Sequence, residues 1–210
     1  HSLRVPRPDL AERFGTPDAC TACHKDQSSG WAAKQVETWF GEQRRREFHF
    51  GEALFAMRSG TFGAAEQLSR LLNDPAQPAI ARATALAESA PYLDETGIEG
   101  VKAGLRDVDP LVRMGALRAF EAFDGPTRVQ LGSILLRDPV RSVRLAAVHQ
   151  LAIVKTSEMP EQVRSDFELA TQEFIAVQEH NADRPYSHIN RGLFYHRQGR
   201  FEDAEAAYLA

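Results

Sequence analysis

Apolar residues recur with the spacing of a helix face through the middle of the chain. In residues 112–123 and 143–154 they stand three and four positions apart, so each stretch would bury one stripe. The stripes comprise Val112, Ala116, Ala119, Phe120 and Phe123, and Val143, Ala147, Val148, Leu151 and Val154. The opposite faces carry Arg113, Arg118, Arg141 and Arg144. Apolar and polar residues rarely alternate singly, as they do in half-buried strands, and this pattern predicts an all-α protein.

A recurring Asp-Pro dipeptide accompanies this pattern. It occurs at spacings of 35 and 29 residues, as Asp74-Pro75, Asp109-Pro110 and Asp138-Pro139. Asp caps the free amides of a helix and Pro presets the first helical residue, so each dipeptide is predicted to open a helix. A recurrence of about 30 residues predicts helical units that stack and bury a continuous core.

The segments after the second and third dipeptides resemble each other and the HEAT-like repeat family, in which two antiparallel helices form one unit. They read DPLVRMGALRAF and DPVRSVRLAAVHQL. The first segment, DPAQPAIARATALAESA, departs from the other two by an insertion and the additional Pro78. The resemblance implies stacked helix pairs in this part of the chain.

A second kind of repeat is predicted near the C-terminus. Its period is 34 residues, the tetratricopeptide (TPR) period, because Phe167, Ala170 and Phe174 reappear as Phe201, Ala204 and Tyr208. The last segment resembles a TPR repeat at Gly192, Tyr195, Gly199, Phe201, Ala204 and Tyr208. It departs from the family at Arg191, where a Leu is usual. Both resemblances imply a helical-repeat solenoid, HEAT-like and then TPR-like, of the kind whose faces bind proteins or peptides.

The N-terminal region has a different character. Prolines at positions 6, 8 and 17 prevent one continuous helix before residue 30, and short helices are predicted at Trp31–Phe40, Phe50–Ser59 and Phe62–Leu72. Eight of the 18 aromatic residues fall within residues 14–62, where an even spread would place about four. We therefore expect an irregular segment with short helices at 1–60, HEAT-like repeats at 61–158 and a truncated TPR-like repeat at 159–210.

Charge and hydropathy exclude some classes of protein. The chain has 25 Lys and Arg against 29 Asp and Glu, a formal net charge of −4, and it lacks the basic face of a general nucleic-acid binder. Nothing approaches the roughly 18 to 20 consecutive apolar residues of a membrane-spanning helix. The chain starts without Met and ends within a predicted repeat, so we expect it to be a piece of a longer protein.

Residues 20–24 read CTACH, the pattern for covalent attachment of c-type haem. Two thiols three residues apart on one turn can each form a thioether with a haem vinyl group, and the next imidazole is then positioned as proximal iron ligand. This chemistry assigns Cys20 and Cys23 to cofactor binding and His24 to the iron. Zinc is the main alternative, because Cys20, Cys23 and either His24 or His49 would supply three of four tetrahedral ligands. A thioredoxin-like redox pair would need a preceding strand, for which there is no signal.

The second axial ligand of a haem iron has two candidates. His1 and His49 both lie in the aromatic N-terminal region, whereas the remaining histidines, apart from His24, lie in the predicted repeats. Methionine ligation is less favoured, because Met57 is the only Met nearby. The run Arg44-Arg45-Arg46 is explained most simply as a solvated loop, and pairing with haem propionates or an acidic partner is the alternative.

A wider resemblance supports the haem interpretation. HSLRVPRPDL, followed by GTPDACTACHKDQSSGWAAKQVETWFG, resembles the last haem-binding segment of bacterial multihaem c-type cytochromes that continue into HEAT-like and TPR repeats. This resemblance covers residues 1 to about 60, and the order of the later modules agrees with it. It implies Cys20 and Cys23 as thioether residues, His24 as proximal ligand, further haem motifs upstream, and export to the periplasm or beyond.

We therefore expect an electron-transfer c-type cytochrome segment with covalent haem, joined to a helical-repeat scaffold that docks a redox partner protein or peptide. The alternative is a non-redox interaction scaffold in which the CTACH motif is unoccupied or binds zinc. No phosphate-binding loop, metalloprotease motif or nucleophile elbow is present, so nothing in this chain names a substrate. Any haem oxidoreductase activity would belong to a longer chain.

Overall fold

The computed structural model describes residues 5–210, in which every regular element is a helix. These residues form two compact units, divided between Gln67 and Leu68. The predicted all-α class is confirmed. None of the helices in the described part of the chain is both long and apolar enough to cross a membrane.

Unit 1, up to Gln67, contains α1 (Pro8–Phe14), α2 (Ser29–Phe40), the 3-10 turn η1 (Glu42–Arg45), α3 (Phe50–Ser59) and the start of α4 (Ala64–Leu72). The three helices predicted from the pattern are confirmed with ends that differ by no more than two residues. Short α1 was not predicted. It begins with Pro8 at its first turn and ends at Gly15 in the left-handed conformation, so the local proline and glycine define it.

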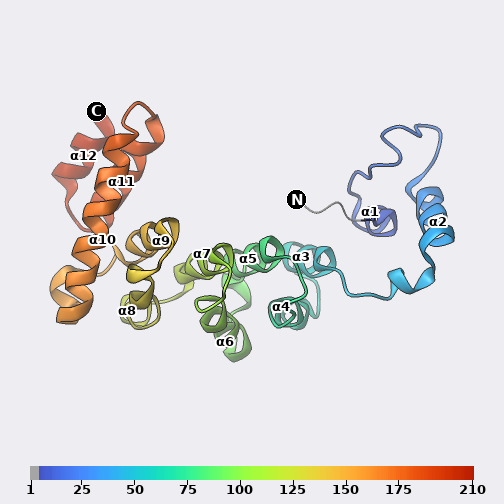
Figure 1. Ribbon diagram of the computed structural model, residues 1–210, viewed down its shortest axis with the longest axis horizontal. Helices are drawn as coiled ribbons and strands as arrows, with labels where there is room; N and C mark the ends of the chain where they lie inside the picture. The colour runs from blue at the N-terminus through green and yellow to red at the C-terminus, as the bar shows by residue number, and fades with distance from the viewer. Residues whose placement is uncertain (1–4) are drawn as a thin grey trace. The chain divides into compact units, whose positions relative to one another are not determined.

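Unit 2 begins within α4 and contains α5 (Ala79–Ala87), α6 (Glu95–Gly104), α7 (Pro110–Arg118), α8 (Gly125–Gly132), α9 (Arg141–Leu151), α10 (Glu161–His180), α11 (Pro185–Arg197) and α12 (Phe201–Leu209). Short 3-10 turns η2 (Ala90–Tyr92), η3 (Ala119–Ala122), η4 (Ser133–Arg137) and η5 (Thr156–Glu158) connect them. Within this unit α5 packs against α7, α7 against α9, and α9 against α10 (Figure 1). The predicted divisions at residues 60 and 158 stay predictions.

The predicted apolar stripes form the core of unit 2. The stripe at 143–154 is buried throughout, and the stripe at 112–123 is buried except for the partly exposed Phe123. Gly115 lets α7 approach α5 closely, because a Cβ at this position would lie 2.4 Å from the carbonyl oxygen of Ala83. The sequence pattern therefore identified the core-facing side of α7 and α9 correctly.

Only one of the three Asp-Pro dipeptides opens a helix as predicted. Asp109 caps α7 by accepting the N–H of Leu111, and Pro110 is the first helical residue. The prediction is wrong for Asp74-Pro75, which forms a turn before α5, and for Asp138-Pro139, because α9 begins two residues later. The Asp138 carboxylate accepts the N–H of Val140 and binds Arg113, so its oxygens bond outside the helix.

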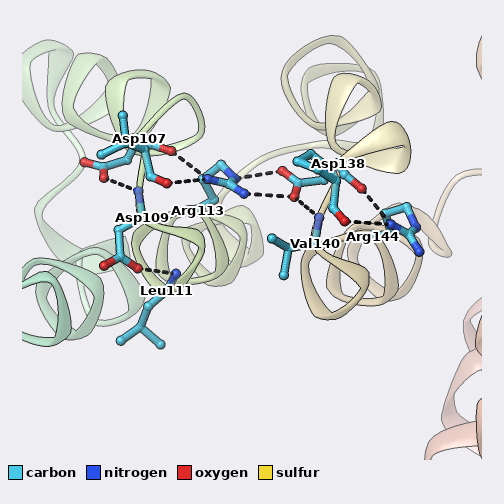
Figure 2. Close-up of polar contacts among 9 residues, drawn as sticks. Asp107, Asp109, Leu111, Arg113, Asp138, Val140 and Arg144 are labelled. Atoms are coloured by element: carbon cyan, nitrogen blue, oxygen red, sulfur yellow. Dashed lines mark hydrogen bonds and ion pairs between the residues drawn. The ribbon is translucent and has the colours of Figure 1, made fainter.

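Three arginines of unit 2 recur with a spacing of 31 residues. Arg82, Arg113 and Arg144 are each the fourth residue of their helix, and each binds a carboxylate further along the chain. Figure 2 shows the central member: Arg113 Nε and Nη2 lie 2.7 and 2.9 Å from the carboxylate oxygens of Asp138. Arg113 Nη1 also donates to the carbonyl of Asp107, as Arg144 Nη1 does to that of Asp138.

The ion pairs of Arg82, Arg113 and Arg144, called the arginine ladder below, correct one expectation about the arginines. The side chain of Arg113 is only 10% exposed, so it does not lie on a solvent face as predicted. Arg144 is partly buried, whereas Arg118 and Arg141 are exposed as expected. The helical pattern cannot distinguish a solvated arginine from one whose carboxylate partner lies in a later segment of the chain.

The C-terminal helices pair closely. Gly192 in α11 faces Tyr208 in α12, and a Cβ at Gly192 would lie 2.3 Å from the tyrosine ring. His149 joins α9 to this pair by accepting from Arg197 at 3.0 Å. Burial, followed by the charge of Arg197, lowers the pKa of His149 from 6.5 to about 4.

Candidate functional site

The CTACH segment forms a single turn in unit 1. The backbone N–H groups of Cys23 and His24 both donate to the carbonyl oxygen of Cys20, at 3.1 and 2.9 Å. Cys20 is partly exposed, and Cys23 and His24 are exposed. The structure therefore brings the three predicted site residues together on one turn, with both thiols unbridged.

Asp18 organises this turn from the position two residues before Cys20. Its Oδ1 accepts the N–H groups of Cys20 and Thr21 at 2.8 and 2.9 Å, and its Oδ2 accepts the Thr21 hydroxyl at 2.9 Å. Oδ2 also accepts the hydroxyl of Ser29, the first residue of α2, at 2.6 Å. These bonds, led by that from Ser29, lower the pKa of Asp18 to about 2, so the carboxylate is charged at neutral pH.

Helix α2 supports the other end of the turn. Ser28 caps the helix by accepting the N–H of Trp31 at 3.1 Å. The Trp31 ring then lies 5.1 Å from the ring of His24. A ring packed at this distance restricts the orientation of the imidazole without taking up either ring nitrogen.

An apolar pocket of about 500 Å³ lies beside the turn. Its walls come from α1, from the segment that leads to the CTACH turn, and from α3. Phe14 and Phe55 both line it and stack on each other with ring centroids 4.3 Å apart. Asp18 and Ala19 line the pocket as well, so it reaches the residues directly before Cys20. A volume in this range suits a large apolar cofactor or ligand.

His49 lies at the rim where α3 begins. It caps this helix: its Nδ1 accepts the N–H of Gly51 at 3.1 Å, and the carboxylate of Glu52 accepts the N–H of His49 at 3.4 Å. His49 also lines the pocket. Since Nδ1 serves the helix cap, Nε2 is the ring nitrogen that an iron would take. The other distal candidate, His1, lies outside the described residues.

Cationic side chains stand around the same pocket. Arg7 and Arg58 both line it, and Arg7 binds Asp9 at 2.9 Å.

Of the predicted arginine run, Arg45 binds Glu37 at 2.7 Å and Arg46 is exposed, and the side chain of Arg44 lies outside the described part of the structure.

The donor set for a zinc ion is incomplete in the described residues. No group of three or more His, Cys, Asp or Glu side chains is arranged there to hold a metal ion. Cys20 and Cys23 belong to the turn, whereas His49 is the residue that caps the start of α3.

Sequence reasoning missed Asp18 and the pocket. An Asp two residues before a turn is the usual signal of a side chain that caps backbone amides, and it was available at Asp18. The pocket results from packing of α1 against α3, which no local pattern predicts.

Comparisons of the chain with protein families, curated proteins and solved structures give no match.

Proposed function

We propose that unit 1 binds one haem c covalently and that the chain is a segment of an exported electron-transfer protein. The observation that supports this most directly is the CTACH turn, which places two accessible thiols and an accessible imidazole on one turn. When bound, haem would supply a one-electron carrier between its ferric and ferrous states.

The residues of the turn have separate roles in this proposal. The thiols of Cys20 and Cys23 would hold the haem by adding to its two vinyl groups; each addition would replace the S–H bond by an S–C bond and place the hydrogen on the other vinyl carbon, without oxidation or reduction. His24 offers an exposed imidazole as proximal ligand, with its ring packed against Trp31. The arrangement of these residues fits the group on the chemistry of the donors and on their accessibility.

His49 would be the second side chain to hold the iron. It lines the apolar pocket that adjoins the turn, and the capping bond to Gly51 selects Nε2 for the iron. The stacked Phe14 and Phe55 would exclude water from the macrocycle, and Arg7 or Arg58 would face its propionates. His/His ligation would give a lower reduction potential than His/Met ligation.

Unit 2 is proposed to be a helical-repeat solenoid, HEAT-like and then TPR-like, that docks a redox partner. The 31-residue spacing of Arg82, Arg113 and Arg144 supports the stacking, because each arginine links its helix to the segment of the following repeat. The close α11–α12 pair at Gly192 supports the TPR-like end.

Variants of the turn test this function in a host that attaches c-type haem in its periplasm. Wild type should retain haem after denaturation, and the variant with both Cys20→Ser and Cys23→Ser should lose it. His24→Ala should lose the six-coordinate spectrum, and His49→Ala should become partly high-spin while it keeps the covalent haem. Wild-type protein without haem would favour the repeat scaffold alone as the function.

A further inference from the structure

The Asp18 carboxylate is bonded entirely to the CTACH turn and to the start of the next helix. Four donors converge on it: the amides of Cys20 and Thr21, and the hydroxyls of Thr21 and Ser29. No lysine or arginine of the described chain forms an ion pair with it. Among the described residues, hydrogen bonds from the turn and from Ser29 of α2 therefore stabilise its charge.

The bonds at Asp18 and those at the Cys20 carbonyl act on opposite ends of the same turn. Asp18 holds the two amides at its start, and the Cys20 carbonyl accepts the amides of Cys23 and His24 at its end. The bond from Ser29 then connects the turn to α2, which carries Trp31 against His24. One carboxylate thus fixes the turn and its position relative to the helix that supports His24.

We propose that Asp18 is a positioning residue for haem attachment, which holds the CTACH turn in one conformation before either thioether forms. This inference rests on the proposed function. Two thiols must add to one rigid macrocycle, and a turn that is already ordered loses less conformational entropy when the second bond forms. Without Asp18 the amides of Cys20 and Thr21 lose their acceptor, and the turn samples more conformations.

The chain offers both a rescue and a matched control. Asn at position 18 keeps an oxygen for the two backbone amides, and its NH₂ group can donate to the hydroxyls of Thr21 and Ser29, because hydroxyls also accept. Asp26 is an exposed aspartate near the turn, and its side chain accepts from Gln27 and from its own backbone amide but from no amide of residues 20–24. Asp18→Asn should therefore preserve positioning, and Asp26→Ala should leave it unchanged.

The experiment expresses wild type, Asp18→Ala, Asp18→Asn and Asp26→Ala in the same haem-attaching host. Haem per chain and the pyridine haemochrome spectrum, which distinguishes one thioether from two, are measured for each. We expect Asp18→Ala to lose roughly tenfold in doubly attached product, because charge-assisted bonds to two amides are removed. Asp18→Asn should stay close to wild type, and Asp26→Ala should equal it.

Amide exchange in the protein without haem provides a second readout. The N–H groups of Cys20 and Thr21 should exchange faster in Asp18→Ala than in wild type, while the amides of α3 stay unchanged. Normal double attachment in Asp18→Ala would overturn the inference and leave the proposed function intact. Equal losses of doubly attached haem in Asp18→Ala and Asp26→Ala would also overturn it. So would faster amide exchange throughout unit 1 in Asp18→Ala, because that result would identify general destabilisation. Absence of haem from wild type would overturn both.

Discussion

Replacement of Asp138 by Ala is the sharpest test of the ladder in unit 2. Its side chain is 4% exposed and that of its partner Arg113 is 10% exposed, and two parallel hydrogen bonds join them. The carboxylate also accepts the N–H of Val140 at 2.8 Å. The substitution therefore removes three hydrogen bonds and leaves a guanidinium buried without its counter-charge.

The expected cost follows from this burial. Removal of one partner from a buried ion pair costs about 3–5 kcal/mol, mostly because the other charge stays uncompensated. Arg113 keeps the carbonyl oxygens of Asp107 and Val108 as acceptors, which puts the expected loss near the lower end, at about 3 kcal/mol. The exposed pair Glu99–Lys102, with side chains 70% and 36% exposed, should contribute at most about 0.5 kcal/mol.

Urea unfolding followed by far-UV circular dichroism measures both values. Asp138→Ala, Arg113→Met and the double variant form a mutant cycle, and Glu99→Ala serves as the surface control. We expect the double variant to be more stable than Asp138→Ala, because it no longer buries an unpaired guanidinium. A loss below about 1 kcal/mol in Asp138→Ala, or a cycle with no coupling, would refute the view that this pair is a buried link between α7 and the segment before α9.

Two further predictions concern unit 2. The pKa of His149 is lowered to about 4, so between about pH 6.5 and pH 4 the unfolded chain binds a proton at this residue and the folded chain does not. The free energy of unfolding should therefore fall by on the order of 2 kcal/mol as the pH drops through this range, after allowance for partial exposure, and then become constant. Thermal melts at several pH values measure this change, and a His149→Gln variant should lack it. Gly115→Ala should lower the free energy of unfolding in urea by about 2–3 kcal/mol, because its Cβ would lie 2.4 Å from the backbone of Ala83. Gly100→Ala is the control and should be nearly neutral, because its Cβ would contact only the movable end of the Leu72 side chain. Equal effects of the two substitutions would contradict the close approach of α5 and α7.

Helix positions in this chain were accessible to sequence reasoning because they depend on local signals. The pattern of residues 31–40 and 50–59 matches α2 and α3, since apolar periodicity and glycine stops act within a few residues. The spacing of the arginine ion pairs was not accessible in the same way. The Asp-Pro dipeptides suggested spacings of 35 and 29 residues, whereas the arginines with carboxylate partners recur at 31, because Asp138 binds Arg113 of α7 and does not cap α9.

The candidate site likewise has one part that the sequence predicts and one part that it does not. CTACH is readable because its chemistry needs five consecutive residues. The pocket forms only when α1 packs against α3, which a local pattern does not predict. His49 is held as the cap of α3 by hydrogen bonds with Gly51 and Glu52. A pattern of residue types gives no distance between His49 and the turn, so His49 and His1 could not be separated from the sequence.

The most direct test of covalent haem binding is the intact mass of the wild-type chain, exported from a haem-attaching host and measured with its reduced-minus-oxidised visible spectrum. If the chain binds haem covalently, its mass will increase by one haem that survives denaturation, and its spectrum will show the sharp reduced bands of a six-coordinate haem c. An unmodified mass from that host, with both thiols still open to alkylation, would contradict it.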